Sequence, residues 1–214
     1  MANPPTRIWI ARHGQSEANT KGLFCGQSES PLTELGREQS RALARRLAGV
    51  PIKAVYTSDL GRAIETAALA LEGRAMTPRV DADLREIHYG RWEMRRESDI
   101  RREDAEQTRL LRDEDPAWQP PGGESLGQVR ERIHAALKAI ASRHHHEDVL
   151  VVSHGTAIAC MLAEVVAAAP THTLRFDFAN CALSAVTAGS HGRLYLTLVN
   201  DTSHLAGVGA GGPK

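Results

Sequence analysis

The sequence predicts an α/β fold, a three-layer α/β/α sandwich with a mostly parallel central sheet. Short apolar runs at residues 7–11, 53–57 and 149–152 have the length of buried strands, and a helical segment follows each of them along the chain. The run 149–152 is apolar without interruption, which is typical of a strand buried on both faces. Repeated units of this kind place helices on both sides of one sheet.

The expected helices begin at polar residues that can cap them. Thr33 opens an amphipathic segment over residues 33–47, and Ser58 or Asp59 precedes an alanine-rich helix that reaches about residue 71. Residues 126–144 are also amphipathic, and the helix after residues 153–155 is apolar to about residue 168. Residues 176–188 and 193–199 alternate as edge or antiparallel strands do.

The length of 214 residues predicts one domain with one sizeable core, which we expect over residues 1–206. The segment of about 93–123 is highly charged with scattered leucine and isoleucine, and we expect it to be a helical lid insertion over the surface. The glycine-rich residues 207–214 predict a flexible tail.

Composition limits the partners and the compartment. Lysine plus arginine total 26 and aspartate plus glutamate total 26, so no overall charge attracts nucleic acid or an anionic membrane. The N-terminal apolar segment, residues 8–11, is far shorter than a signal-peptide core of about 7–15 residues, and no stretch approaches the roughly 20 apolar residues of a membrane span. The three widely spaced cysteines suggest reduced thiols. We therefore expect a cytoplasmic protein, and exposed strand edges near residues 194–199 leave a homodimer open.

Three strand-to-helix junctions carry cationic or titratable side chains. They are Arg12-His13-Gly14, Asp59-Leu60-Gly61-Arg62 and Ser153-His154-Gly155. Because ligands in open α/β sheets bind beyond the carboxyl ends of the strands, we expect two histidines and two arginines to share one pocket. Arginine forks match phosphate oxygens, and a neutral imidazole can attack phosphorus in line. The junctions therefore predict phosphoryl transfer that needs no metal.

The stretch from Arg12 to Asn19 resembles the Arg-His-Gly signature of the histidine phosphatase superfamily, which includes the cofactor-dependent phosphoglycerate mutases. Residues 56–66, 84–93, 122–125 and 152–155 resemble further blocks of that family in the expected order. The resemblance covers residues 7–199 and implies a phosphoglycerate mutase-like fold.

The same resemblance implies a role for each matching residue. His13 would be the phosphorylated nucleophile, and Arg12, Arg62 and His154 would complete the phosphate pocket. Glu86 would protonate the departing oxygen and later take a proton from the attacking water. The implied phosphate-binding or substrate-loop positions are Asn19, Ser16, Gly155, Cys25 and Gly26.

Phosphatases and mutases of this family share the phosphohistidine and differ in whether water or a substrate hydroxyl accepts the phosphoryl group. The segment that closes with Pro120 to Ser125 resembles the phosphatase branches, although Met94 stands where many phosphatases carry glycine. We expect a metal-independent phosphomonoesterase for a small phosphorylated metabolite, without a cofactor. A mutase that uses 2,3-bisphosphoglycerate and an inactive phosphate-binding scaffold remain alternatives. A contact of His88 or the arginines of the lid insertion with substrate also remains open.

Overall fold

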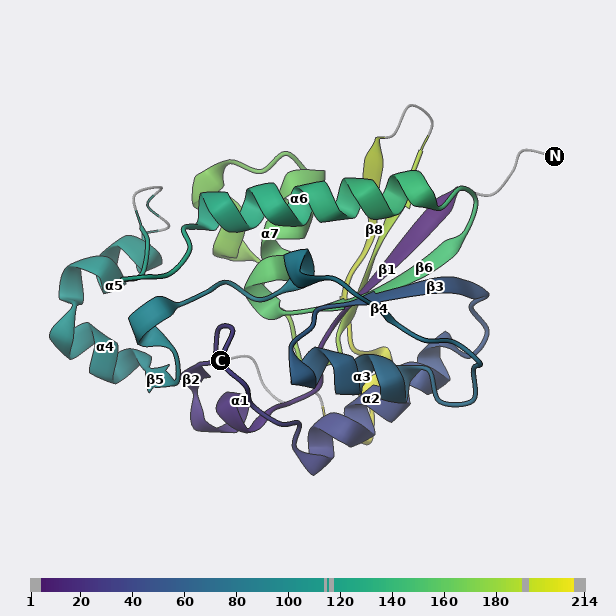
Figure 1. Ribbon diagram of the computed structural model, residues 1–214, viewed down its shortest axis with the longest axis horizontal. Coiled ribbons are helices and arrows are strands. Elements are labelled where there is room, and N and C mark those ends of the chain that lie inside the picture. Colours follow the sequence, from purple (N-terminus) through teal and green to yellow (C-terminus); the bar gives the residue numbers. More distant parts are fainter. Residues whose placement is uncertain (1–4, 114, 116–117, 190–192, 210–214) are drawn as a thin grey trace.

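A six-stranded sheet forms the centre of the computed structural model, which describes residues 5–113, 115, 118–189 and 193–209 (Figure 1). The strand order is β4-β3-β6-β1-β7-β8. The first four strands pair in parallel, whereas β7 pairs antiparallel with both of its neighbours, β1 and β8. The strands are β1 (Thr6–Arg12), β3 (Ile52–Thr57), β4 (Arg79–Val80), β6 (Asp148–Ser153), β7 (Leu183–Ala188) and β8 (Leu194–Asp201). The mostly parallel sheet that the sequence predicted is confirmed.

Helices cover both faces of this sheet (Figure 1). They are α2 (Glu34–Leu47) and α3 (Gly61–Ala70) on one face, and α6 (Leu126–Arg143) and α7 (Gly155–Val165) on the other. Successive side chains of β1 serve the two faces, because Ile8 and Ile10 pack in the core under α6 and α7 whereas Trp9 packs in the core under α2 and α3. None of the helices in the described part of the chain is both long and apolar enough to cross a membrane.

Two predicted boundaries were wrong for local reasons. Helix α3 begins at Gly61 after Leu60, because the Ser58 hydroxyl accepts the amide of Leu60 inside the turn and caps nothing further along the chain. Residues 176–182 do not extend strand β7, because the Cys181 amide and the Asn180 side chain both donate to the carbonyl of His13. That segment therefore supports the loop after β1 and leaves the sheet ladder.

Short elements that periodicity did not reveal complete the fold. These are α1 (Glu17–Lys21), β2 (Leu23–Phe24) and the short 3₁₀ helices η1 (Ala82–Leu84), η2 (Gly90–Trp92), η3 (Pro170–Arg175) and η5 (Ser203–Leu205). The predicted insertion contains β5 (Arg95–Arg96), which pairs with β2, followed by α4 (Glu97–Glu103) and α5 (Ala105–Arg112). Residues 114, 116 and 117 of the insertion lie outside the described residues.

The predicted tail begins in contact with helix α2. The Gln39 side chain donates to the carbonyl of Gly209 at 2.9 Å. Val208 packs against the small apolar cluster of Ala42, Cys181 and Leu205. Residues 210–214 lie outside the described residues.

Met94 joins the site-bearing loops to strand β5 in a conformation that favours glycine. Its φ of 58° is in the left-handed region, and its amide donates to the carbonyl of Phe24 at 2.7 Å. A β-carbon in this region contacts the following carbonyl, at a cost of about 1 kcal/mol. This cost explains on physical grounds why glycine suits the position.

We expect Met94→Gly to be more stable than Met94→Ala by about 1 kcal/mol, because both variants lose the side chain but only glycine relieves the left-handed backbone. Urea unfolding of the two variants beside the unmodified chain measures the difference. An alanine variant as stable as the glycine variant would show that the backbone at Met94 carries no such cost.

Candidate functional site

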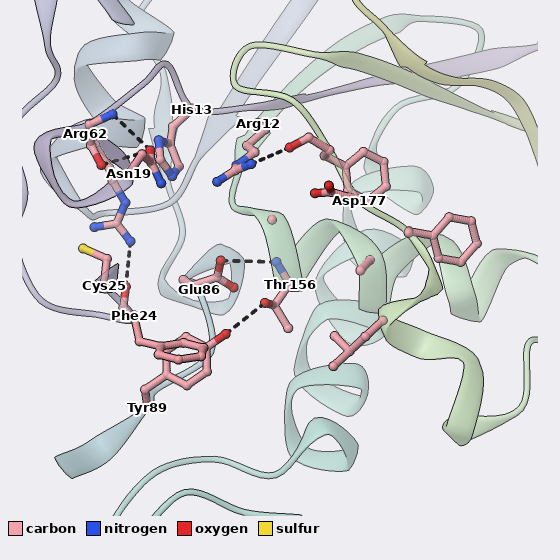
Figure 2. A pocket seen from close by; sticks show the side chains of 17 residues that line it. Arg12, His13, Asn19, Phe24, Cys25, Arg62, Glu86, Tyr89, Thr156 and Asp177 are labelled. Carbon is pink, nitrogen blue, oxygen red and sulfur yellow. Dashed lines mark hydrogen bonds between the residues drawn. The ribbon is translucent and has the colours of Figure 1, made fainter. Parts of the chain in front are cut away.

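A cavity of about 170 Å³ opens at the carboxyl end of β1, and all the predicted site residues except His154 line it (Figure 2). Those that line it are Arg12, His13, Ser16, Asn19, Cys25, Gly26, Arg62, Glu86 and Gly155. His154 does not line it, but its ring centroid lies 5.1 Å from that of His13. The fold therefore brings together side chains that are separated by more than a hundred residues in the chain.

The backbone of His13 is fixed on both sides. Its amide donates to the carbonyl of Ser153 at 3.0 Å, and its carbonyl accepts the amide of Cys181 and the side chain of Asn180. The ring nitrogen Nδ1 lies 2.7 Å from the carbonyl oxygen of Gly14. Because a carbonyl can only accept, Nδ1 carries the proton, and Nε2 is the unprotonated nitrogen of the neutral ring.

Gly14 allows the loop after β1 to pass directly against helix α2. A β-carbon at Gly14 would lie 2.4 Å from the carbonyl oxygen of Gly36, so any residue other than glycine would clash with helix α2 here. The amide of Gly14 donates to the Thr66 hydroxyl on helix α3 at 3.0 Å. The loop is thus held between two helices, and it carries His13 to a fixed position.

Both arginines of the cavity are anchored by backbone carbonyls and keep one N–H group unpaired. Arg62 donates to the carbonyls of Ser28 at 2.9 Å and Gly26 at 2.6 Å, and Arg12 donates to the carbonyl of Phe178. In both guanidinium groups the buried Nε has no partner among the described residues. A buried unpaired donor costs about 1–3 kcal/mol, so an anion that accepts from these groups would be favoured.

The loop that holds Arg62 is itself held by Glu93. One carboxylate oxygen of Glu93 accepts the amide of Gln27 at 2.9 Å, and the other accepts the hydroxyl of Ser28. Gly26 has a φ of 55° and passes so close to Glu93 that a β-carbon would lie 2.4 Å from its Oε1. Glu93 therefore positions Arg62 through the carbonyls of this loop.

His154 is a fully buried histidine in a cationic environment. It precedes the first residue of α7, and neither ring nitrogen has a hydrogen-bond partner among the described residues. Desolvation, and after it the positive charges of the guanidinium groups of Arg62 and Arg12, hold its pKa well below the usual range. The ring is therefore neutral at neutral pH.

Glu86 lies at the amino terminus of helix α7 and points into the cavity (Figure 2). Its Oε2 accepts the amide of Thr156 at 3.2 Å, and its Oε1 accepts the amides of Ala157 at 3.1 Å and Ile87 at 2.9 Å. Two of these three donors are amides of the first turn of helix α7. These bonds fix the carboxylate on the opposite side of the cavity from Asn19 (Figure 2).

An arginine outside the cavity holds the backbone that carries Glu86. Arg132 on helix α6 donates to the carbonyls of Arg85 at 2.8 Å and Glu86 at 3.0 Å, and it pairs with Glu124 at 2.8 Å. Glu124 also accepts the amide of His88 at 2.9 Å. Sequence reasoning missed this pair, because the block 122–125 gave no role for Glu124 and Arg132 is one of many charges on an amphipathic helix.

The other basic groups that the sequence singled out lie away from the cavity. None of the described residues from 91 to 112 lines it. Four arginines of the lid insertion instead pair with carboxylates of the same segment, namely Arg95, Arg102, Arg109 and Arg112. His88 lies 3.6 Å from Glu93 and also does not line the cavity.

Comparison with known proteins agrees with this geometry. The family model of the histidine phosphatase superfamily (branch 1) matches residues 8–202. The chain is 34% identical over 163 residues to the adenosylcobalamin/alpha-ribazole phosphatase of Escherichia coli (strain K12), covering 75% of this chain and 79% of that one. It is 33% identical over 180 residues to a probable phosphoglycerate mutase of Cronobacter sakazakii, covering 84% of each chain. The structure of Bacillus stearothermophilus YhfR superposes with a TM-score of 0.89 at 31% identity, covering 94% of this chain and 99% of that one.

The buried neutral His154 predicts a loss of stability in mild acid. Below a pH of about 6.5 an unfolded chain protonates this histidine while the folded chain does not, so the free energy of unfolding falls as the pH falls. Between pH 6.5 and 5, we expect the free energy of unfolding of His154→Gln to change less steeply with pH than that of the unmodified protein, by up to about 1.4 kcal/mol per pH unit. Urea unfolding at several pH values measures it, and equal slopes for the two proteins would contradict the neutral buried state.

Proposed function

Because the chain belongs to branch 1 of the histidine phosphatase superfamily, we propose that it hydrolyses phosphomonoesters of small metabolites through a covalent phosphohistidine on His13. The observation that supports this best is the environment of His13. Its Nδ1 donates to the carbonyl of Gly14, which leaves the lone pair on Nε2, and two arginines with unpaired buried N–H groups line the same cavity. A nucleophile and a dianion site therefore coincide.

In the first half-reaction, Nε2 of His13 attacks phosphorus as the bond from phosphorus to the leaving oxygen breaks. Arg12 and Arg62 donate to the equatorial phosphoryl oxygens, where charge is spread in the transition state. Glu86 gives its proton to the leaving oxygen, so the alcohol departs neutral. Neutral His154 adds no positive charge next to the attacking nitrogen, and it can donate one further hydrogen bond to the phosphoryl group.

In the second half-reaction, water attacks the phosphorus of phospho-His13 and the bond from nitrogen to phosphorus breaks. Glu86 takes the proton of that water, which returns the carboxyl group to its starting state as inorganic phosphate forms. One carboxyl group thus serves both steps, and no metal takes part in the scheme.

Asn19 is placed to donate to the bound phosphoryl group. Its Oδ1 already accepts the amide of Ser16 at 3.0 Å and the side chain of Asn180 at 3.2 Å. The amide NH₂ is then the part of the side chain that remains for a ligand. Ser16 and Gly155 also line the cavity and, having small side chains or none, would leave room there for a phosphoryl group.

A phosphoglycerate mutase is the second candidate, and the relative from Cronobacter sakazakii is its support. It would use the same phosphohistidine and the same cationic groups. The difference is the acceptor, since a mutase keeps the sugar acid bound and returns the phosphoryl group to another of its hydroxyls. Only turnover distinguishes the two.

We expect His13→Ala to lower phosphate release by at least about 10³-fold, because the covalent route is lost. Release is measured in excess EDTA with a panel of phosphomonoesters, and an exposed histidine variant, His145→Ala, is the matched control. The panel includes 3-phosphoglycerate with and without 2,3-bisphosphoglycerate, with detection of the isomer. Isomerisation that dominates release would indicate the mutase, and no turnover by the folded protein would favour a binding or scaffold role.

Glu86→Gln is expected to slow release from an alkyl phosphate by about 10²- to 10⁴-fold, because the leaving alkoxide is no longer protonated. With 4-nitrophenyl phosphate, whose phenolate departs without a proton, Glu86→Gln should slow the phosphorylation of His13 less. Because the same variant also slows the attack of water on phospho-His13, phosphohistidine should accumulate with this substrate. Rapid-quench detection of acid-labile, base-stable protein phosphate measures this. Equal losses in the phosphorylation rate with both substrates would contradict an acid role for Glu86.

A further inference from the structure

The cavity around His13 has a wall of a different chemical character from its cationic end. Phe24, Tyr89, Leu174, Phe176 and Phe178 contribute to this wall. The rings of Phe24 and Tyr89 meet edge to face at 4.8 Å, and those of Phe176 and Phe178 stack at 6.3 Å with an angle of 14°. Such surfaces favour a flat or apolar group of the ligand over a hydrated one.

In the proposed mechanism, the two arginines of the cavity both bind the phosphoryl group. Among the described lining residues, the only arginine or lysine side chains are Arg12 and Arg62. The cavity of about 170 Å³ is smaller than the roughly 300–1,000 Å³ of pockets that enclose a drug-sized ligand. It can hold the phosphoryl group and the nearest atoms of the alcohol, and the alcohol then extends along the aromatic wall.

Asp177 places a negative charge on this wall. It lies between Phe176 and Phe178 in the chain, lines the cavity and is exposed, and within the described part of the chain its carboxylate has no hydrogen bond or ion pair. Figure 2 shows it on the same side of the cavity as Arg12. Burial lowers the pKa of Arg12, and the negative charges of Glu86 and Asp177 act against this by raising it. Asp177 therefore interacts electrostatically with Arg12 without a direct ion pair.

The position of Asp177 has a consequence for the alcohol part of a substrate. A second anionic group, such as the carboxylate of a sugar acid or a second phosphate, would face Asp177, and the described lining residues offer it no arginine or lysine besides Arg12 and Arg62. Coulomb's law with an effective dielectric constant of about 40, between the values for a protein surface and for bulk water, gives about a fivefold to tenfold loss of affinity for an assumed separation of about 7 Å. A neutral or cationic alcohol does not meet this repulsion.

We propose that Asp177 determines specificity, and that with the aromatic wall it selects phosphomonoesters of neutral or cationic, partly apolar alcohols against sugar-acid phosphates and bisphosphates. This inference rests on the proposed phosphatase function. It assigns the leaving-group side of the cavity to a substrate class, and it argues against phosphoglycerate as the substrate.

Glycerol 3-phosphate and 3-phosphoglycerate test the proposal, because they differ only in a hydroxymethyl group against a carboxylate. We expect the unmodified protein to have a higher kcat/KM for glycerol 3-phosphate. In Asp177→Asn, which keeps the shape and removes the charge, the ratio of the two kcat/KM values should fall by about fivefold to tenfold. Glu38→Gln makes the same change in net charge on the exposed surface of α2 and should leave the ratio as it was.

A third substrate, phenyl phosphate, tests the aromatic wall. Its kcat/KM should exceed that of glycerol 3-phosphate, and Phe176→Ala should lower this preference by about threefold or more, as expected for loss of an aromatic contact. The specificity inference alone would be overturned if Asp177→Asn left the ratio of kcat/KM for glycerol 3-phosphate to kcat/KM for 3-phosphoglycerate unchanged. A preference of the unmodified protein for 3-phosphoglycerate would overturn it as well. No release from any of the three substrates by the folded protein would overturn the proposed function together with it.

Discussion

The parallel pairing of β1 with β6 is the constraint on which the site depends. In this register Arg12 lies beside Ser153, so the residues that follow the two strands, His13 and His154, leave the sheet at the same edge. The amide of His13 continues the ladder by donating to the carbonyl of Ser153. A shift of register by one residue would reverse the faces of every side chain in β1, so the apolar cores on both sides of the sheet fix the position of His13.

Two features limit the electrostatic repulsion among the basic side chains of the cavity. Backbone carbonyls stabilise the arginines, and one of the two histidines is neutral. Arg62 and Arg12 are held by carbonyl oxygens, which stabilise a guanidinium without filling the position of an anion. Desolvation keeps His154 neutral, so the ring packs against His13 without adding to the charge. The carboxyl group of Glu86 lies in the same cavity, and three backbone amides hold it in place. The cavity is thus organised before any ligand enters.

The sequence predicted those parts of the fold and site that depend on local pattern. Apolar runs located β1, β3 and β6, and the polar residues at their ends located the cavity, because a parallel sheet brings those ends together. Contacts between distant segments could not be predicted in this way. Arg132 holds the backbone of Glu86 from another helix, and residues 176–182 alternate like a strand but bond to His13. Met94 was predicted only in part. Its place at a position where many phosphatases carry glycine singled it out in the sequence, but its left-handed backbone conformation became known only from the structure.

The two sides of the cavity are linked through one guanidinium. The segment with Phe176, Asp177 and Phe178 lies between η3 and β7, outside the regular sheet, and Arg12 donates to the carbonyl of Phe178 within it. The amide of Ala179 donates to the Asn200 side chain on β8, which fixes the far end of the same segment. Arg12, to which the proposed mechanism assigns the phosphoryl oxygens, therefore also positions the aromatic wall of the cavity. Because of this shared contact, a substitution that moves the wall also moves Arg12. Under the proposed function, changes in substrate preference and in the rate of phosphoryl transfer would therefore be coupled.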